Sequence, residues 1–184
     1  MSIALKILLA SDGLVILAGA MLGPIYALFV EEIGGDILTA GISFAVFSLV
    51  MGILILVFGK IEDSFWEEKK LWICLGYLLM AVGFFSYLFV KSPSHLFIVQ
   101  VILGIGGAIQ TPAYSAVYSK NLDHKKPAFQ WGAWDAIRNF ATALGALAGA
   151  ALVTVFGFNI LFVIMGFLAL FSGAIIFFAP RKML

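Results

Sequence analysis

Six long apolar runs, separated by short polar segments, limit this chain to one kind of fold. They predict helices over residues 5–30, 37–58, 71–90, 96–119, 129–156 and 160–178. Each run has about the 20 residues that a helix needs to cross the hydrocarbon core of a bilayer. Of the 184 residues, 63% are hydrophobic and only 11% are charged. A soluble domain needs a charged surface, and a chain of this composition has too few charged residues to form one. The sequence therefore predicts an all-α integral membrane protein, a single domain over residues 1–184 with six transmembrane helices.

Basic residues gather in alternate loops and at the two ends of the chain. The loops after the second and fourth runs, together with the ends, hold Lys6, Lys60, Lys69, Lys70, Lys120, Lys125, Lys126, Arg181 and Lys182, whereas the remaining loops hold only Lys91. Cytoplasmic loops of membrane proteins carry an excess of Lys and Arg. We therefore expect both termini and both longer loops in the cytoplasm, and the protein in the plasma (cytoplasmic) membrane.

The sequence offers no pattern for catalysis, for a metal ion or for a cofactor. His95 and His124 lie in loops without another ligand at metal-binding spacing. The glycines that follow Gly104 lie within a helix and lack the Lys and Ser/Thr of a nucleotide-binding loop. The net charge is +1, and the basic residues do not form a stripe or a tail. We therefore expect no enzyme activity, no cofactor, no metal and no nucleic-acid partner, and we interpret the single cysteine, Cys74, as a packing residue.

The first three runs are similar to the last three. Pro24 and Pro112 lie late in the first and fourth runs, and the second and fifth runs both end in Val-Phe-Gly. The third and sixth runs each contain two glycines at the same spacing: Gly76 and Gly83, and Gly166 and Gly173. Since three spans is an odd number, the second copy must be inverted relative to the first. We expect a 3+3 inverted repeat, with copies at about residues 5–90 and 95–179.

Three segments carry a resemblance to a known family. Gly59–Asp63 follows the second run with a Gly-x3-Asp pattern, the fourth run contains Gln100-x3-Gly104, and the fifth contains Gly145-x3-Gly149. In these segments the chain resembles the major facilitator superfamily, although Gln100 stands where that family usually has arginine. Members usually have twelve helices in two six-helix halves. This chain is similar to one such half.

The resemblance implies secondary active transport of a small solute by alternating access. The two halves of a full transporter are related by an axis along the membrane normal, so a parallel C2 homodimer would rebuild the full shape. We expect this homodimer, surrounded by membrane lipid, to be the working unit, with a small-molecule substrate and a proton or another cation as a candidate coupling ion. Two alternatives stay open: a non-transporting membrane scaffold, and one half of a split transporter that pairs with a different chain.

Three ionisable residues, Asp12, Asp135 and Arg138, lie inside the predicted spans. Charges within a bilayer are costly and usually face partners or water. The resemblance makes the first and fifth helices neighbours, so we expect an Asp12–Arg138 pair. The pair would be a proton or cation site, with Arg138 holding the carboxylate or binding an anionic substrate. The alternative is a buried salt bridge that only fixes helix packing. Asp135 is either a compensating charge on the same helical face or part of a latch.

Tyr26, Gln100 and Tyr114 are candidate hydrogen-bonding residues of a central cavity. One face of the first helix carries Asp12, Ile16, Gly19, Gly23 and Tyr26, and one face of the fourth carries Gln100, Gly104, Gly107, Thr111, Tyr114 and Tyr118. In the resembled fold these two helices line the central cavity. The alternative is close helix packing through the glycines.

Small residues on the second and fifth helices are candidates for the dimer seam. They are Gly41, Ser48, Gly52, Gly145 and Gly149. Small faces let helices approach closely, and the resemblance brings the second helix of one half against the fifth helix of the other. Candidates for a conformational latch at this seam are Gly59, Asp63 and Asp135. Asp63 would lie near the start of the partner's fifth helix, where the helix dipole favours an anion; the alternative is a solvated loop carboxylate.

Overall fold

The computed structural model describes residues 1–64 and 68–180, so Arg181 and Lys182 of the predicted cytoplasmic set lie outside the described part. Its helices are α1 (Ile3–Leu22), η1 (Gly23–Ile25), α2 (Tyr26–Glu32), α3 (Ile37–Ser64), α4 (Lys69–Ser86), η3 (Tyr87–Phe89), α5 (Pro93–Lys120), α6 (Pro127–Phe156) and α7 (Phe158–Phe178). Within these residues there is no strand, and six helical segments are long and apolar enough to cross a membrane. The predicted all-α fold with six spans is confirmed.

The first span is not one continuous α-helix, as the sequence analysis expected over residues 5–30. It consists of α1, a short 3-10 turn η1, and α2. The change of helix type falls on Gly23 and Pro24. Proline lacks the amide hydrogen that an α-helix needs at its interior positions, and its ring crowds the preceding turn. The break therefore has a local cause in the sequence.

The charged stretch between the second and third spans is more helical than expected. α3 continues to Ser64 and α4 begins at Lys69, so the prediction of a loop over residues 59–70 is wrong at both ends. The added turns of α3 pack into the protein, because Glu62 is fully buried. The Lys69 ammonium lies 3.4 Å from the carbonyl oxygen of Glu62 and 3.6 Å from the carboxylate of Asp63. Tertiary contact with α4 thus extends the helix past the apolar run.

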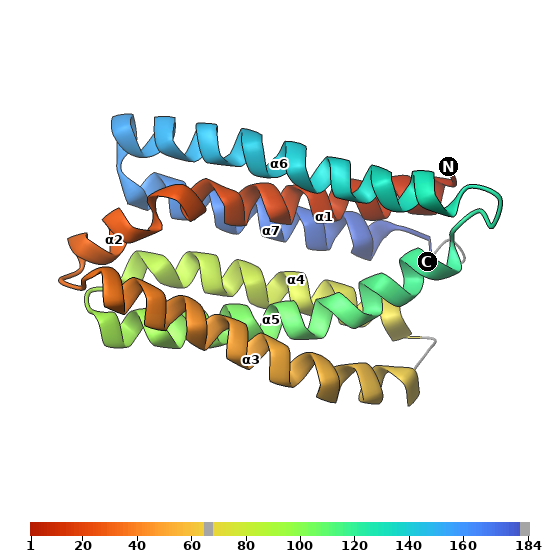
Figure 1. Ribbon diagram of the computed structural model, residues 1–184, viewed down its shortest axis with the longest axis horizontal. Coiled ribbons are helices and arrows are strands. Elements are labelled where there is room, and N and C mark those ends of the chain that lie inside the picture. Colours follow the sequence, from red (N-terminus) through yellow and green to blue (C-terminus); the bar gives the residue numbers. More distant parts are fainter. Residues whose placement is uncertain (65–67, 181–184) are drawn as a thin grey trace.

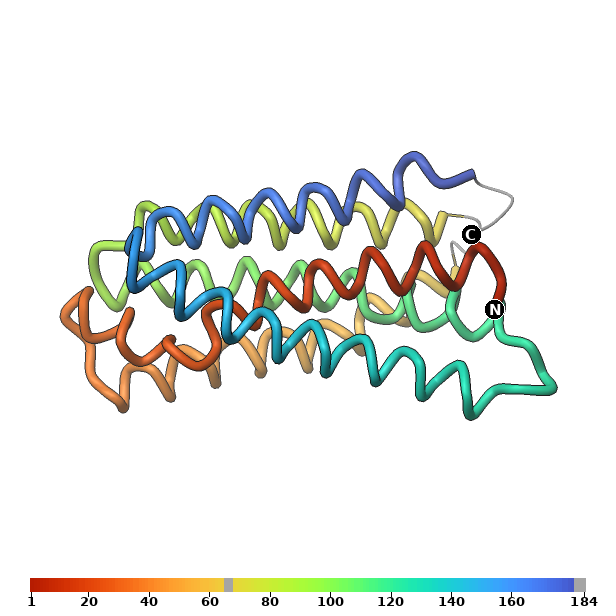
Figure 2. The backbone as a smooth tube through the Cα atoms, turned by 90° about the horizontal axis from the view of Figure 1, so that it is seen from above, coloured from red at the N-terminus to blue at the C-terminus, as the bar shows by residue number. Residues whose placement is uncertain are grey.

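The six spans form a bundle (Figures 1 and 2), and the spans that contain α1, α4, α5 and α7 are more buried than those of α3 and α6. α1 packs against α6 and α7, α5 packs against α3 and α4, and α4 packs against α7. In the expected repeat, the first span corresponds to the fourth, which is α5, and the second span, α3, corresponds to the fifth, α6. The α1–α6 contact therefore corresponds to the α5–α3 contact. The helix pairs are therefore those that an inverted repeat of residues 5–90 and 95–179 would produce, and the repeat itself stays a prediction.

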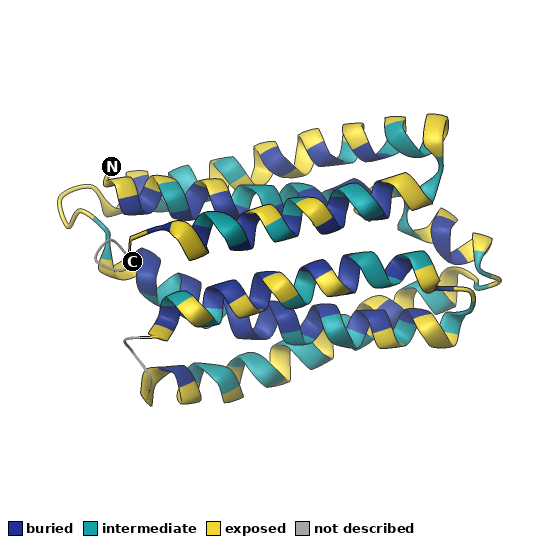
Figure 3. Ribbon diagram, turned by 180° about the vertical axis from the view of Figure 1, so that it is seen from behind, coloured by how far each residue is buried: buried dark blue, intermediate teal, exposed yellow. Residues whose placement is uncertain are grey.

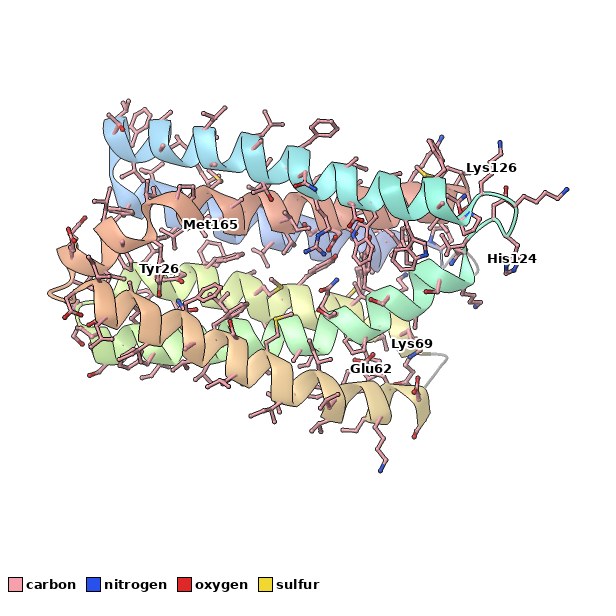
Figure 4. All side chains as sticks on the ribbon, in the orientation of Figure 1. Tyr26, Glu62, Lys69, His124, Lys126 and Met165 are labelled. Carbon is pink, nitrogen blue, oxygen red and sulfur yellow. The ribbon has the colours of Figure 1, made fainter. Side chains whose placement is uncertain are left out.

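The connections between spans alternate between two ends of the bundle. The start of α1, the end of α7 and the α5–α6 connection lie at one end, whereas the α2–α3 and α6–α7 connections lie at the other (Figure 1). Lys69, His124 and Lys126 lie at the first end (Figure 4), which we call the basic end. At the opposite end Gly157 joins α6 to α7 with φ of +76°, a conformation that favours glycine.

Asp36 fixes the start of α3 at the opposite end. Its Oδ1 accepts hydrogen bonds from the Thr39 hydroxyl at 2.6 Å and from the Thr39 amide at 2.7 Å. This is the arrangement of a helix N-cap, which satisfies an amide that the helix leaves unpaired. The hydroxyl and amide hydrogen bonds from Thr39 hold the pKa of Asp36 below its usual value.

Two helices bury far less of their surface than the others. In the most apolar stretch of α3 6% of residues are buried, and in that of α6 17%, compared with 61% in α5. Figure 3 shows α3 largely in the colours of exposed and intermediate residues. Large apolar side chains such as Leu49, Ile53, Phe140 and Leu147 point outward from these two helices. α3 and α6 are therefore the spans most available to lipid or to another protein.

Candidate functional site

A cavity of about 430 Å³ lies inside the bundle and is lined by residues from all six spans. This volume is within the range of small-molecule sites in proteins. The wall includes every member of the face predicted on the first span: Asp12, Ile16, Gly19, Gly23 and Tyr26. Tyr26 and Met165, labelled in Figure 4, contribute from α2 and α7. The 3-4 spacing along the first span therefore identified one side of this cavity.

Toward the basic end, the carboxylate of Asp12 is held by Trp134 and not by Arg138. The indole Nε1 of Trp134 donates a hydrogen bond to Asp12 Oδ2 at 2.6 Å. The Arg138 guanidinium carbon lies 5.3 Å from the centroid of the Trp134 ring, within the range of cation–π attraction. Arg138 attracts Asp12 electrostatically, but across residues 1–64 and 68–180 no ion pair within 4.0 Å joins them. Trp134 thus contacts both of the charged groups that the sequence analysis expected to pair with each other.

An aromatic cluster from α5 and α6 holds Trp134 in place. The ring centroids of Tyr114 and Tyr118 each lie 5.4 Å from that of Trp134, and the ring of Trp131 lies 5.2 Å away. Tyr114 is only 1% exposed and does not line the cavity. Its hydroxyl has no hydrogen-bond partner among the described residues. Tyr114 therefore packs against Trp134 and is not among the residues that line the cavity, whereas the sequence analysis expected it there.

Toward the opposite end, a second polar group joins four structural elements. Gln100 Nε2 on α5 donates to the hydroxyl of Tyr26 on α2 at 2.7 Å and to the hydroxyl of Tyr87 on η3 at 3.0 Å. The Tyr26 hydroxyl also lies 2.6 Å from Ser43 Oγ on α3. Tyr26 and Gln100 both line the cavity, as the sequence analysis expected of this pair. Their hydrogen bonds tie α2, α3 and η3 to the buried helix α5.

The wall between the two polar groups is apolar and rich in methionine. It is formed largely by Met51, Met80, Met165, Phe47, Phe84 and Leu103. Methionine side chains adapt to irregular ligand shapes because they are unbranched and polarizable. Along α5, Gln100 and Thr111 both line the cavity and are separated by a rise of about 16 Å. The cavity therefore suits an elongated organic molecule.

Replacing Gln100 with leucine should destabilise the protein. The change removes the donor to two hydroxyls, and Tyr87 is only 3% exposed. A buried polar group that loses its partner costs about 1–3 kcal/mol. Thermal unfolding of the purified protein in detergent should show the loss. Ser86→Ala is a matched control, because the exposed Ser86 hydroxyl donates only to the carbonyl of Val82 in its own helix; equal unfolding temperatures would contradict the role of Gln100.

The predicted seam residues fall into two groups. On α3, Gly41, Ser48 and Gly52 are exposed, and a Cβ at either glycine would meet nothing within 4 Å. On α6, Gly145 and Gly149 are buried, because they pack against the backbone of α1 in the same chain. The α6 glycines therefore serve contact within one chain, whereas the α3 residues remain available for contact between chains.

The predicted latch residues lie near the basic end without forming a latch within the chain. Gly59 is a helical residue of α3, and a Cβ there would make ordinary contact at 3.7 Å with Pro112 of α5. The Asp63 side chain is 79% exposed beside Lys69. Asp135 is exposed on α6, and its carbonyl oxygen accepts a hydrogen bond from Asn139 at 2.8 Å. Their predicted role across a dimer seam stays a prediction.

The sequence analysis missed Trp134, Ser43 and Tyr87. A signal existed for Trp134, since residues four apart on a helix share a face and Trp134 precedes Arg138 by four positions. For Ser43 and Tyr87 no local pattern was available, because their partners Tyr26 and Gln100 come from other spans.

Comparison with known proteins gives a consistent set of relatives. The sequence model of the Major Facilitator Superfamily matches residues 8–183. An MFS-type transporter of Methanocaldococcus jannaschii is 23% identical over 154 residues, which cover 84% of this chain and 39% of the relative. YitZ, an MFS-type transporter of Bacillus subtilis, is 24% identical over 156 residues, covering 85% of this chain and 94% of YitZ. The multidrug resistance protein MdtG of Salmonella typhimurium is 24% identical over 160 residues, covering 85% of this chain and 39% of MdtG. The chain thus spans about two fifths of two of these relatives and nearly all of the third.

Proposed function

We propose that this chain, which belongs to the Major Facilitator Superfamily, carries a small solute across a membrane by alternating access. The observation that carries the proposal is the cavity of about 430 Å³ within six apolar spans, with polar groups toward both ends and an apolar wall between them. A solute that leaves water needs hydrogen-bonding groups to replace its lost hydration. The two polar groups supply them.

We propose that the working unit is a parallel homodimer, because the cavity is open on one side. Gly19, Gly23, Phe44 and Arg138 line the cavity and are also exposed. A charged residue at the centre of a membrane helix costs about 2.5–3.5 kcal/mol on insertion scales, so the exposed guanidinium needs a cover other than lipid. A second copy with the same orientation would cover it, and the basic ends of both copies would face the cytoplasm.

The solute is an organic molecule with an apolar body. The walls formed by Met51, Met80 and Met165 favour such a body over a sugar. The relative MdtG is named as a multidrug resistance protein, which fits the same class of solute.

Transport by the pure protein in proteoliposomes tests the proposal. A thermal-shift screen of small organic solutes would identify those that stabilise the protein. Counterflow with a labelled stabilising solute should then give transient accumulation in proteoliposomes and none in empty liposomes. Binding without exchange would favour a non-transporting scaffold. Activity that appears only with a second, different six-helix chain would favour a split transporter.

Asp12→Asn should abolish accumulation driven by a pH gradient while counterflow continues. The amide oxygen can still accept the Trp134 hydrogen bond, but the side chain can no longer take up or release a proton. The measurement compares solute uptake with and without an imposed gradient. Glu32→Gln is the control, because Glu32 is an exposed carboxylate at the end of α2. If Asp12→Asn still accumulates solute under the gradient, Asp12 is not the proton site.

A further inference from the structure

The cavity is lined by one cationic and one carboxylate side chain, and no ion pair within 4.0 Å joins these two described residues. Among the described residues that line the cavity, Arg138 is the only basic side chain and Asp12 the only acidic one. The Trp134 indole N–H donates a hydrogen bond to Asp12 Oδ2, and the Arg138 guanidinium lies over the indole ring. The Arg138 guanidinium is therefore left without a carboxylate partner in the described part of the chain.

The separation is built into the packing around Trp134. Tyr114, Tyr118 and Trp131 contact its ring, and Tyr114 and Tyr118 are both fully or almost fully buried. A side chain held in this way cannot swing aside without disrupting several aromatic contacts. With Trp134 held in this way, Arg138 faces the cavity, and no hydrogen bond or ion pair joins its guanidinium to another described residue.

Arg138 also lies well within the membrane-spanning part of α6. It is the twelfth residue of α6, which places it about 16 Å along the helix from Pro127. A planar guanidinium at such a depth binds a carboxylate, sulfonate or phosphate through two parallel hydrogen bonds. The donors that Asp12 does not use are therefore available to an anionic group that enters the cavity.

We propose that Arg138 is the anion-binding residue of this cavity and that the solute is an elongated organic anion. Its anionic group binds the guanidinium, and its apolar body lies along Met51, Met80 and Phe84 toward the second polar group at Tyr26. Trp134 is a positioning residue, because it acts by keeping Asp12 away from Arg138. The inference rests on the proposed transport function, since it names the class of solute that the cavity takes.

Three probes of the same length and different charge test the inference: phenylhexanoate, phenylhexylamine and phenylhexanol. Binding to the purified full chain in nanodiscs is measured by calorimetry. The carboxylate should bind at least about tenfold more tightly than the amine or the alcohol, as expected for one charge-assisted bidentate contact. An amine that binds as tightly as the carboxylate, or the absence of carboxylate binding, would overturn the inference.

Variants of Arg138 assign the effect to one residue. Arg138→Gln should weaken phenylhexanoate about tenfold, to the affinity of phenylhexanol, and leave phenylhexanol unchanged. Arg138→Lys keeps the charge without the planar fork and should be intermediate. Lys125→Gln removes the same charge from an exposed loop outside the cavity and should bind as the wild type does. Equal carboxylate affinity in Arg138→Gln and Lys125→Gln would contradict the proposal.

Variants of Trp134 separate positioning from simple packing. Trp134→Phe keeps an aromatic ring but loses the N–H, so Asp12 is released to pair with Arg138 and carboxylate affinity should fall several-fold. Adding Asp12→Asn removes the competing carboxylate and should restore the affinity. A purely structural role for Trp134 predicts no such restoration.

The outcomes also separate this inference from transport itself. If phenylhexanoate binds through Arg138 but is not exchanged in counterflow, the anion site stands and the transport proposal fails. If the amine or the alcohol is exchanged and the carboxylate is not, transport stands and the anion site is wrong.

Discussion

Gly149→Ala is expected to leave little folded protein. A Cβ at this position would overlap the carbonyl oxygen of Met21 and would lie 2.6 Å from its carbonyl carbon. These are backbone atoms of α1, which cannot rotate away as the end of a side chain can, so the two helices would have to separate. Overpacking costs about 1–3 kcal/mol and occasionally more. The Trp134–Asp12 hydrogen bond crosses the same α1–α6 interface and would be disturbed as well.

The matched control for this prediction is Gly132→Ala on the same helix, α6. Gly132 is exposed, a Cβ there meets nothing within 4 Å, and alanine is the better helix former. Both variants would be compared with the wild type by size-exclusion yield in detergent and by thermal unfolding. Gly132→Ala should match the wild type. If Gly149→Ala gives the same yield and unfolding temperature as Gly132→Ala, α1 and α6 do not pack as closely as the structure shows.

The six spans and one wall of the cavity could be predicted because they depend on local patterns. Apolar runs of sufficient length predict spans regardless of how the helices pack. The spacing of Asp12, Gly19 and Tyr26 selects one helical face, and all three line the cavity. The Gly23-Pro24 break was also present in the sequence, but treating the first apolar run as one helix hid it.

The contacts between spans could not be predicted from the same patterns. Small residues permit close approach to any helix, so Gly149 and Gly52 looked equivalent although one packs on α1 and the other faces outward. We expected Asp12 and Arg138 to pair with each other, whereas the contact that each makes with the Trp134 indole depends on how α1 and α6 meet. Tyr114 shares a helical face with Gln100, but it is buried against the Trp134 ring of α6. Each of these differences concerns which neighbouring helix packs against a given helical face.

A crosslink between α3 of one copy and α6 of another is the second large effect that we expect. The proposed homodimer would bring these two poorly buried helices together in opposite directions. Ser48 lies about 16 Å along α3 from Ile37, and Leu144 lies about 18 Å from Phe156, both counted from the end opposite the basic end. Both residues are exposed, and Leu144 is 61% exposed. Residues at equal depth on facing helices are within reach of a short bifunctional maleimide.

The experiment uses two differently tagged copies in which Cys74 is replaced by serine, one carrying Ser48→Cys and the other Leu144→Cys. Random pairing of equal amounts of the two copies makes half of the dimers mixed, so treatment in native membranes should convert up to about half of the protein into a doubly tagged product. Pairing Ser48→Cys with Phe171→Cys is the control, because Phe171 is 61% exposed on α7 at a depth of about 20 Å. This pair should give almost no product, since α7 packs on the far side of the bundle against α4. A product from the α7 pair and not from the α6 pair would mean that copies meet through another face, and the open side of the cavity would then need a different cover.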